Sequence, residues 1–533
     1  MIDMSALEAQ VEHEMQKHKV PAFGLAIVVG SEVTYARGFG VTSVENPCLA
    51  VTPQTLFGCG SISKSLTAAT IMCLVDRGKL ALDAPVTTYV PWLTFSHPAF
   101  ASGVTLRRLL SHSSGLFGTA GNFGPRDLSG LETFIRDTIP HLDFVAPPGR
   151  VYEYCSFGVD LAGYVAEVAG GQYFPDLVRE YLLDPLDMQR TTYDRTVAMT
   201  FDVALPHITA GDGGFTVQHR MFDYAAANPA AQAMTSTLDL AHFVIMALNG
   251  GLFRGRRVLP ARLVAEMLRP QVGLHDADGS GYGLGFFTLQ CRGRRWITHG
   301  GMLTPYLCEI SLFPDEGIGV IFQCNVTNDF DPAAIRRRIF DEYLGSSTSA
   351  AQPVAAFRPR PTVTLSDYAG AYFSLAAGLV TISHVADHLV VERQGEYIDL
   401  RPARDNLFMS QDSSVVVGFV LETTQAPQYF MLDEHVYSRF EPQAAVELAS
   451  STMEAYRGHY RFEDGDTATV WIQHDTLYLS LSWLDGHHQC LPLSKGKFAS
   501  AVGLVEFRLH PQGHFVLVWA GGVLTERLIE EPQ

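Results

Sequence analysis

Apolar and polar positions follow two different patterns along the chain. Over roughly the first 340 residues, strand-like apolar runs stand at both ends of a helical middle. The runs 25–29 and 33–39 are separated by Gly30, Ser31 and Glu32, which predicts a hairpin. Helical spacing is found in the first 20 residues and over 61–77, 105–111, 157–169 and 236–249. Strand-like runs return at 296–298, 307–313 and 318–323. This order predicts one antiparallel sheet that closes late in the chain, with helices grouped beside it.

The second half of the chain has an all-β pattern. Residues 345–362 are rich in Ser, Ala and Pro and predict a linker. Beyond them, short β-branched and aromatic runs alternate with turn residues. The string from Tyr368 to Tyr372, Tyr-x-Gly-x-Tyr, recurs from Tyr456 to Tyr460, and each copy opens a segment of similar length. Unless this recurrence is a coincidence, it indicates two copies of one small barrel.

We therefore predict an α+β fold in three domains. A catalytic domain with an antiparallel sheet and helices spans residues 1–344 and is followed by the linker 345–362. Two small antiparallel β-barrels then span 363–443 and 452–533.

Composition narrows the function classes. The 533 residues include 38 Lys and Arg against 56 Asp and Glu, a net charge of −18, and 47% are apolar. This excludes a mainly disordered chain and disfavours nucleic-acid or anionic-membrane partners. No apolar run approaches the ~18 residues of a membrane span, and the polar N-terminus does not resemble a signal peptide. Eight scattered cysteines without a CxxC pair suggest neither a zinc site nor a disulfide framework, so we expect a cytoplasmic protein.

The strongest chemical signal is Ser61 followed three residues later by Lys64, at the start of a predicted helix that Gly78 closes. Residues three apart share a helix face, so the two side chains point the same way. A serine hydroxyl becomes a good nucleophile when a neighbour takes its proton. The alternative is an ordinary helix cap with a solvated lysine. Ser494 to Lys497 has the same spacing, and there we expect a turn.

Two further motifs follow. Tyr154 comes just after a Pro-Pro-Gly loop signal, and a tyrosine beside a lysine ammonium can act as a base. The alternative is a packed aromatic at a helix start. His299 precedes Gly300 and Gly301 at the end of a predicted strand, where glycines indicate a close backbone or ligand. A histidine there can donate to a substrate carbonyl or carboxylate, the alternative being a turn with a surface histidine.

Together these motifs resemble the class C β-lactamase-like serine hydrolases of the penicillin-binding-protein type. Ser61-x-x-Lys64, Tyr154-x-Ser156 and His299-Gly300-Gly301 have the order and approximate spacing of that family. The stretches 106–116, 234–241 and 282–286 are also similar to it. The resemblance covers about residues 10–340. It implies Ser61 as the nucleophile, Lys64 and Tyr154 as shared acid and base, and no metal or organic cofactor.

The resemblance also assigns the residues around the nucleophile. It implies an oxyanion hole from the N–H groups of Ser61 and Met302. His299 takes the place of a lysine in β-lactamases, which argues against a dedicated β-lactamase. Ser156 stands where the family usually has Asn, so an ester or an unusual amide gains weight as the substrate. His112 falls in a family-typical helix, and we expect it to be structural.

The plan of one catalytic domain and two barrels resembles the D-aminopeptidases of this family, which are cytoplasmic dimers. In them a loop of the last barrel reaches the active site and limits it to short substrates with a free amine. Residues 484–488 are a candidate for such a loop, and Asp485 could meet an ammonium. The alternative is that Asp485 and Gly486 form a hairpin turn.

We therefore expect a serine hydrolase that forms an acyl-enzyme with a small amide, peptide or ester, and a D-amino acid compound leads. Three alternatives stay open. They are an esterase or acyltransferase, a thioesterase or peptide cyclase on the same site, and a non-catalytic binding module that kept the fold.

Overall fold

The structure is a computed structural model of the 533-residue chain. The residues it describes are 3–118, 125–210, 214–219, 221, 223–274, 280–327, 330–345, 364–404, 406–420, 426–440, 448–462, 466–482, 484–494, 496–509, 515–519 and 523–528. Most of the predicted linker 345–362 lies outside these residues.

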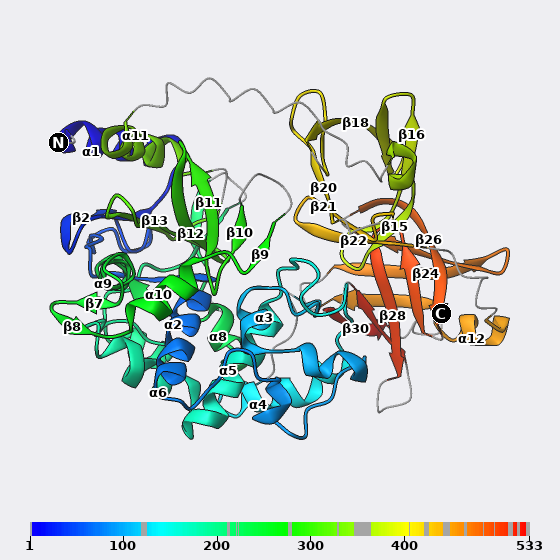
Figure 1. Ribbon diagram of the computed structural model, residues 1–533, viewed down its shortest axis with the longest axis horizontal. Coiled ribbons are helices and arrows are strands. Elements are labelled where there is room, and N and C mark those ends of the chain that lie inside the picture. The colour runs from blue at the N-terminus through cyan, green and yellow to red at the C-terminus, as the bar shows by residue number, and fades with distance from the viewer. Residues whose placement is uncertain are drawn as a thin grey trace.

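An eight-stranded sheet forms the centre of the first domain (Figure 1). Its strand order is β2-β1-β14-β13-β12-β11-β10-β9, so the N-terminal hairpin pairs with the last strand and closes the sheet late, as predicted. The strands are β1 (Ala22–Val29), β2 (Glu32–Gly40), β9 (Val272–Gly273), β10 (Gly281–Tyr282), β11 (Phe287–Cys291), β12 (Arg294–Leu303), β13 (Tyr306–Phe313) and β14 (Ile318–Cys324). Neighbouring strands in it pair antiparallel over the described residues.

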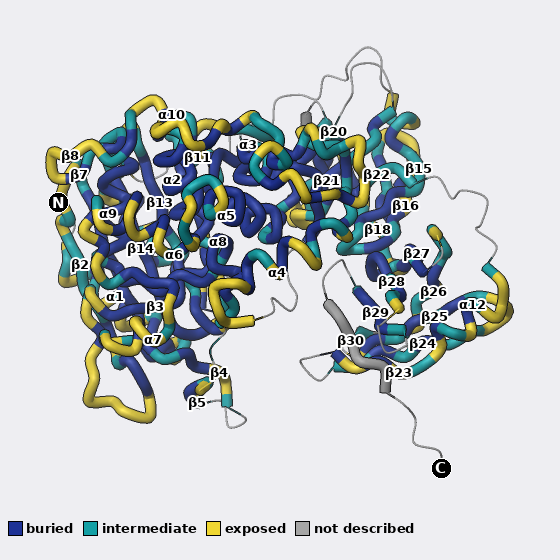
Figure 2. The backbone as a smooth tube through the Cα atoms, turned by 90° about the horizontal axis from the view of Figure 1, so that it is seen from below, coloured by how far each residue is buried: buried dark blue, intermediate teal, exposed yellow. Residues whose placement is uncertain are grey.

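Helices cover both faces of this sheet. On one face α1 and α11 pack together, and their apolar side chains share a core with β1 and β14. On the other face α2 and α9 lie against the sheet, and the remaining helices extend the core away from it (Figures 1 and 2). The helices of this domain are α1 (Met4–Lys17), α2 (Ile62–Asp76), α3 (Leu106–Leu110), α4 (Gly130–Asp137), α5 (Ser156–Gly170), α6 (Phe174–Val178), α7 (Arg195–Ala198), α8 (Asn228–Ala231), α9 (Thr237–Leu248), α10 (Ala261–Leu268) and α11 (Ala333–Leu344).

The described part of the domain also contains three two-stranded sheets. They are β3 (Leu56–Gly58) with β6 (Met234–Ser236), β4 (His207–Thr209) with β5 (Phe215–Val217), and β7 (Leu252–Phe253) with β8 (Arg256–Arg257). The strand β3 matters most here, because it leads directly into the Ser61 motif. None of the described helices is long and apolar enough to cross a membrane.

Two closed barrels follow, as the sequence predicts. The first consists of β15 (Gly370–Ser374), β16 (Gly378–Val385), β17 (His388–Arg393), β18 (Glu396–Arg404), β19 (Leu407–Met409), β20 (Val416–Val420), β21 (Tyr429–Leu432) and β22 (His435–Arg439). After α12 (Ser450–Glu454), the second consists of β23 (Gly458–Phe462), β24 (Thr467–Gln473), β25 (Thr476–Leu481), β26 (Leu484–Ser494), β27 (Lys497–Ser500), β28 (Gly503–Leu509), β29 (Phe515–Trp519) and β30 (Val523–Leu528).

The Tyr-x-Gly-x-Tyr repeat has the same structure in both barrels. In the first, the Tyr372 hydroxyl donates a 2.9 Å hydrogen bond to the carbonyl of Tyr368. In the second, the Tyr460 hydroxyl donates to the carbonyl of Tyr456 at 2.6 Å. All four rings are buried in the barrel cores. The recurrence is therefore a structural repeat and not a coincidence.

Candidate active site

The two residues of the Ser-x-x-Lys motif meet at the start of α2. The ammonium of Lys64 donates a 3.0 Å hydrogen bond to the Ser61 hydroxyl. Ser61 is the N-cap residue of α2, but its side chain caps no backbone N–H of the helix. Lys64 is only 1% exposed, so it is not a solvated lysine. The half-buried Ser61 therefore has Lys64 as the donor to its hydroxyl.

Backbone from α8 holds Lys64 from the other side. Its ammonium also donates to the carbonyl of Ala230 at 3.0 Å. The N–H of Ala230 in turn donates to Asp160 Oδ1 at 3.0 Å, on α5. Asp160 is fully buried, and burial raises the pKa of its carboxyl well above the usual range, against the pull of the nearby Lys64 charge. The turn at Ala230 thus connects a buried carboxyl to the lysine.

Tyr154 lies directly over the lysine. The Lys64 nitrogen is 4.9 Å from the centroid of the Tyr154 ring, a cation–π distance. Tyr154 precedes α5 by two residues and is half-buried, whereas Tyr152, Glu153 and Cys155 around it are buried. The structure therefore brings Ser61, Lys64 and Tyr154 together, although they lie on two different elements.

The glycines of this region let two backbone segments approach closely. Gly60 has a left-handed φ of +52°, and a Cβ there would lie 2.6 Å from the main chain of Met302. A Cβ on Gly301 would lie 2.0 Å from the carbonyl oxygen of Cys59. Strand β12 is thus pressed against the residues just before Ser61, the close approach that the glycines predicted. The Met302 side chain is 59% exposed.

Strand β12 runs two residues past the His299-Gly300-Gly301 end that the sequence predicts. It continues to Leu303, because Gly301 and Met302 keep their pairing with Cys308 and Leu307 of β13. Gly300 is exposed, and a Cβ there would meet no atom within 4 Å, whereas Gly301, the next residue, faces the segment before Ser61.

His299 itself points into the protein. It is 1% exposed, and burial, with a contribution from the Lys64 charge, lowers its pKa to about 3. Its Nε2 lies 2.7 Å from the hydroxyl of Tyr282, and its Nδ1 lies against the carbonyl of Gly300. In the neutral tautomer that satisfies both partners, Nδ1 carries the proton and Nε2 accepts from Tyr282. Both ring nitrogens thus have partners inside the chain, and contact with a substrate remains a prediction that requires this ring to exchange one of them.

For two other predicted residues, Ser156 and Asp485, the structure describes no side-chain contact with this cluster. Ser156 is the first residue of α5 and half-buried, and its hydroxyl has no hydrogen-bond partner among the described residues. Asp485 lies in β26, but its side chain is outside what the structure describes. The hairpin turn is not at Asp485 and Gly486, since Leu484 already pairs with Leu481.

The second Ser-x-x-Lys match is a turn between strands, as expected. Ser494 ends β26, Lys497 begins β27, and the two residues pair directly. The Lys497 ammonium contacts both carboxylate oxygens of Asp143 at 2.7 and 2.8 Å, which ties the second barrel to the first domain.

Sequence reasoning missed two residues of the site. His112, expected to be only structural, has its ring centroid 4.3 Å from that of Tyr154 and 4.7 Å from that of Tyr282. Tyr282 is fully buried and carries the hydroxyl that contacts His299. The Tyr282–Phe286 stretch was a sequence signal for it, but nothing in that stretch named the partner.

A cavity of about 850 Å³ lies apart from this cluster, and its lining includes Thr42, Arg126, Arg195, Asp223 and Met234. Ser61, Lys64 and Tyr154 are not among its lining residues. It approaches the site through Met234 of β6, which pairs with Gly58.

Comparison with known proteins now identifies the family. The family profile described as Beta-lactamase matches residues 7–344. The chain belongs to the beta-lactamase family. The matched region contains every residue of the cluster built above and stops where α11 ends.

Individual proteins and solved structures are also similar to this beta-lactamase family chain. It is 28% identical to penicillin-binding protein 4 of Amycolatopsis lactamdurans over 67% of this chain and 94% of that protein. A structure of an octameric penicillin-binding protein homologue from Pyrococcus abyssi is similar with a TM-score of 0.58 and 23% identity, over 90% of this chain and 98% of that one. SurE is similar with a TM-score of 0.63 and 22% identity, over 82% of this chain and 99% of SurE, and it has also been solved with D-Leu. At these identities the structures show a shared fold.

Proposed function

We propose that this chain is a serine hydrolase that acts through an acyl-enzyme on small amides, peptides or esters, D-amino acid compounds above all. The observation that carries the proposal is the 3.0 Å contact between the Ser61 hydroxyl and the buried Lys64 nitrogen. Burying an ammonium whose hydrogen-bond partners are one hydroxyl and one carbonyl costs folding free energy. The same placement suits the exchange of a proton with that hydroxyl.

The proposed first step is attack of Ser61 Oγ on the substrate carbonyl carbon. In this scheme the hydroxyl proton passes to Tyr154 as the phenolate or to Lys64 as the neutral amine. Lys64 contacts the Ser61 hydroxyl, and the Tyr154 ring centroid lies 4.9 Å from the Lys64 nitrogen. The carbonyl oxygen becomes an oxyanion, for which the N–H groups of Ser61 and Met302 are the proposed donors. The close approach of Gly60 to Met302 supports this pairing.

The proposed second half returns the proton and releases the product. The leaving amine or alcohol takes this proton back from Lys64 or Tyr154, and the acyl group stays as an ester on Ser61. Water, deprotonated by the same residues, then attacks this ester, which frees the acid and restores the Ser61 hydroxyl. The chain's own residues supply each proton transfer of this scheme.

The D-amino acid part of the proposal rests on two supports. SurE, which shares the fold, has been solved with D-Leu. His299 is neutral and buried, and so does not supply the permanent cation that a β-lactam carboxylate would need. The role of Asp485 toward a substrate ammonium remains part of this proposal.

An esterase, acyltransferase or thioesterase is the second candidate. The observation in its favour is Ser156, because a short hydroxyl without a partner offers neither the carbonyl nor the NH₂ of an asparagine to a substrate amide. We also propose a reducing, cytoplasmic location, since six of the eight free thiols are buried.

The test is release of chromophore from D-alanine p-nitroanilide compared with its N-acetylated form and with p-nitrophenyl acetate. Ser61→Ala is the blank, and Ser494→Ala is the matched control in the second Ser-x-x-Lys sequence. Turnover of the free-amine anilide that Ser61→Ala loses and Ser494→Ala keeps supports the D-aminopeptidase. Turnover of the ester alone supports the second candidate. Failure of a fluorophosphonate probe and of all three substrates to acylate Ser61 would overturn the hydrolase.

A further inference from the structure

His112 occupies an unusual backbone position beside the site. It follows α3 with a left-handed φ of +54°, a conformation that non-glycine residues seldom adopt. Its side chain is 1% exposed. Such a conformation persists only where the surrounding structure holds it, so the contacts of His112 are the place to look for its role.

His112 accepts hydrogen bonds from the residues directly before and directly after Tyr154. The carbonyl of His112 accepts the N–H of Glu153 at 2.8 Å. Its ring Nδ1 accepts the N–H of Cys155 at 3.1 Å. The residues on both sides of Tyr154 are therefore fixed by one histidine, once through its main chain and once through its side chain.

The ring of His112 also lies against Tyr154 itself. The two ring centroids are 4.3 Å apart and the planes are tilted by 36°. On its other side the imidazole meets the Tyr282 ring edge-on at 4.7 Å. Tyr282 in turn contacts His299, whose ring centroid lies 6.4 Å from that of Tyr154, so the His112 ring belongs to one cluster with Tyr154, Tyr282 and His299.

The protonation of this ring follows from its contacts. Since Nδ1 accepts a hydrogen bond, the neutral ring carries its proton on Nε2, which has no partner among the described residues. Burial, followed by the Lys64 charge, lowers the His112 pKa well below its usual value. The acceptor at Nδ1 is thus present at neutral pH.

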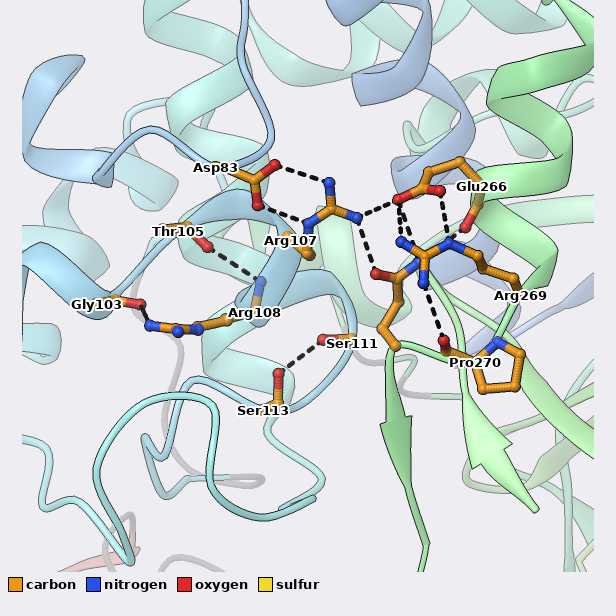
Figure 3. A network of polar contacts seen from close by, with 11 residues as sticks. Asp83, Gly103, Thr105, Arg107, Arg108, Ser111, Ser113, Glu266, Arg269 and Pro270 are labelled. Carbon is orange, nitrogen blue, oxygen red and sulfur yellow. Dashed lines mark hydrogen bonds and ion pairs between the residues drawn. The ribbon is translucent and has the colours of Figure 1, made fainter. Parts of the chain in front are cut away.

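Hydrogen bonds and ion pairs hold the bend at residues 111–113, which carries His112, and the helix α3 before it (Figure 3). The hydroxyls of Ser111 and Ser113, on either side of it, are 2.8 Å apart. In α3, Arg107 forms an ion pair with Asp83 and also contacts Glu266. These contacts join the bend to two distant segments of the domain, so His112 has a fixed base from which to hold the Tyr154 segment.

We propose that His112 is a positioning residue, which through its Nδ1 acceptor and its ring face holds Tyr154 over Lys64 in the orientation needed for proton transfer. The inference rests on the proposed function, because it concerns the proton transfer to and from Ser61. A small displacement of a catalytic group can cost a factor of 10² in rate, so loss of this support should appear in kcat.

The experiment compares three variants that differ in the atom they place near Cys155. His112→Asn puts an amide oxygen close to the Nδ1 position and tolerates a left-handed φ. His112→Gln puts its amide near the Nε2 position, and His112→Leu has no acceptor. The measured quantities are kcat and KM for p-nitrophenyl acetate, the rate of Ser61 labelling by a fluorophosphonate, and Tm. Leu74→Ala, a buried change farther along α2, is the control for lost stability.

We expect His112→Leu and His112→Gln to lower kcat about 10- to 100-fold with little change in KM, and His112→Asn to stay within about fivefold of the wild type. In a Tyr154→Phe background, His112→Leu should cost less than about threefold, because the group it positions is gone. If His112→Leu fails to fold, the Asn and Gln pair gives the same comparison.

Two results would overturn the inference. One is a kcat for His112→Leu equal to that of Leu74→Ala. The other is an equal loss from His112→Leu with and without the Tyr154 hydroxyl, which would make its role purely structural. Both presuppose that wild-type Ser61 is labelled. If it is not labelled, the proposed function fails instead.

Discussion

The main-chain N–H of Val436, in the first barrel, donates a 3.3 Å hydrogen bond to the carboxyl of Glu153, the residue before Tyr154. The contact does not stand alone. Met431 and Val436 of the barrel share a buried apolar cluster with Val151 and Tyr152 of the first domain. The barrel wall is therefore part of the packing that surrounds the tyrosine motif.

This contact predicts a pH-dependent stability. Glu153 is 5% exposed, and burial raises its pKa from 4.5 to about 8. Between these values the folded chain keeps a proton on Glu153 that the unfolded chain has released, so Glu153 lowers the free energy of unfolding as the pH rises through this window. Glu153→Gln should remove this loss, and each pKa unit is worth about 1.4 kcal/mol.

Urea unfolding of the wild type and Glu153→Gln at pH 5 and pH 8 measures the effect. The variant should lose less stability than the wild type between the two pH values. Glu396→Gln, the same change at an exposed position of the first barrel, should follow the wild type. Parallel behaviour of Glu153→Gln and the wild type would show that the carboxyl is already ionised in the folded chain.

The second prediction concerns the Tyr154 hydroxyl. Tyr154→Phe keeps the ring that lies 4.9 Å from the Lys64 nitrogen and contacts His112, and removes only the group that exchanges a proton. We expect kcat to fall about 10²-fold or more, the range for a lost general acid or base, with an unchanged Tm. Steady-state kinetics on p-nitrophenyl acetate and a thermal melt check it. Wild-type rates in the Phe variant would reduce Tyr154 to a packing residue.

Local patterns in the sequence were enough for several elements and for the serine–lysine pair, although helices such as α10 and α11 were not predicted. Helix geometry alone places residues three apart on one face, so the Ser61–Lys64 contact needed no knowledge of the fold. The hairpin at the N-terminus and the repeat of Tyr372 and Tyr460 were equally local.

Contacts between distant segments were beyond such patterns. His112 lies 42 residues before Tyr154, and its role depends on a bend and on a ring contact that no spacing rule encodes. Glu153 and Val436 are 283 residues apart and meet only because the first barrel docks beside the site. Strand β12 runs two residues past its predicted His-Gly-Gly end, because its pairing with the distant strand β13 continues through Met302 and Leu303.

The third prediction uses Ser156→Asn. The residue begins α5 two positions after Tyr154, and its hydroxyl has no partner in the described part of the chain, so the larger amide replaces no existing hydrogen bond. An asparagine can offer both a carbonyl and an NH₂ to a substrate amide. We expect the ratio of anilide to ester turnover to rise. An unchanged ratio, with Ser156→Ala as the matched control, would mean that position 156 does not contact the substrate.

The last prediction concerns the buried carboxyl behind Lys64. Asp160 Oδ1 accepts the N–H of Ala230, whose carbonyl accepts the Lys64 ammonium, each at 3.0 Å. Asp160→Asn keeps an acceptor for Ala230, and since burial raises the Asp160 pKa well above its usual range, the neutral amide resembles the protonated acid. We therefore expect Asp160→Asn to retain most of the stability and activity.

Asp160→Leu removes that acceptor at a similar side-chain volume. It leaves the Ala230 N–H buried without a partner, at a cost of about 1–3 kcal/mol, and loosens the carbonyl that orients Lys64. Urea unfolding and the rate of Ser61 labelling by a fluorophosphonate measure the two effects, and labelling should slow about tenfold or more. Wild-type labelling in Asp160→Leu would mean that Ser61 and α2 hold Lys64 without the Ala230 turn. Equal losses in Asp160→Asn and Asp160→Leu would mean that the carboxyl acts through its charge, which only an ionised Asp160 beside the ammonium can supply.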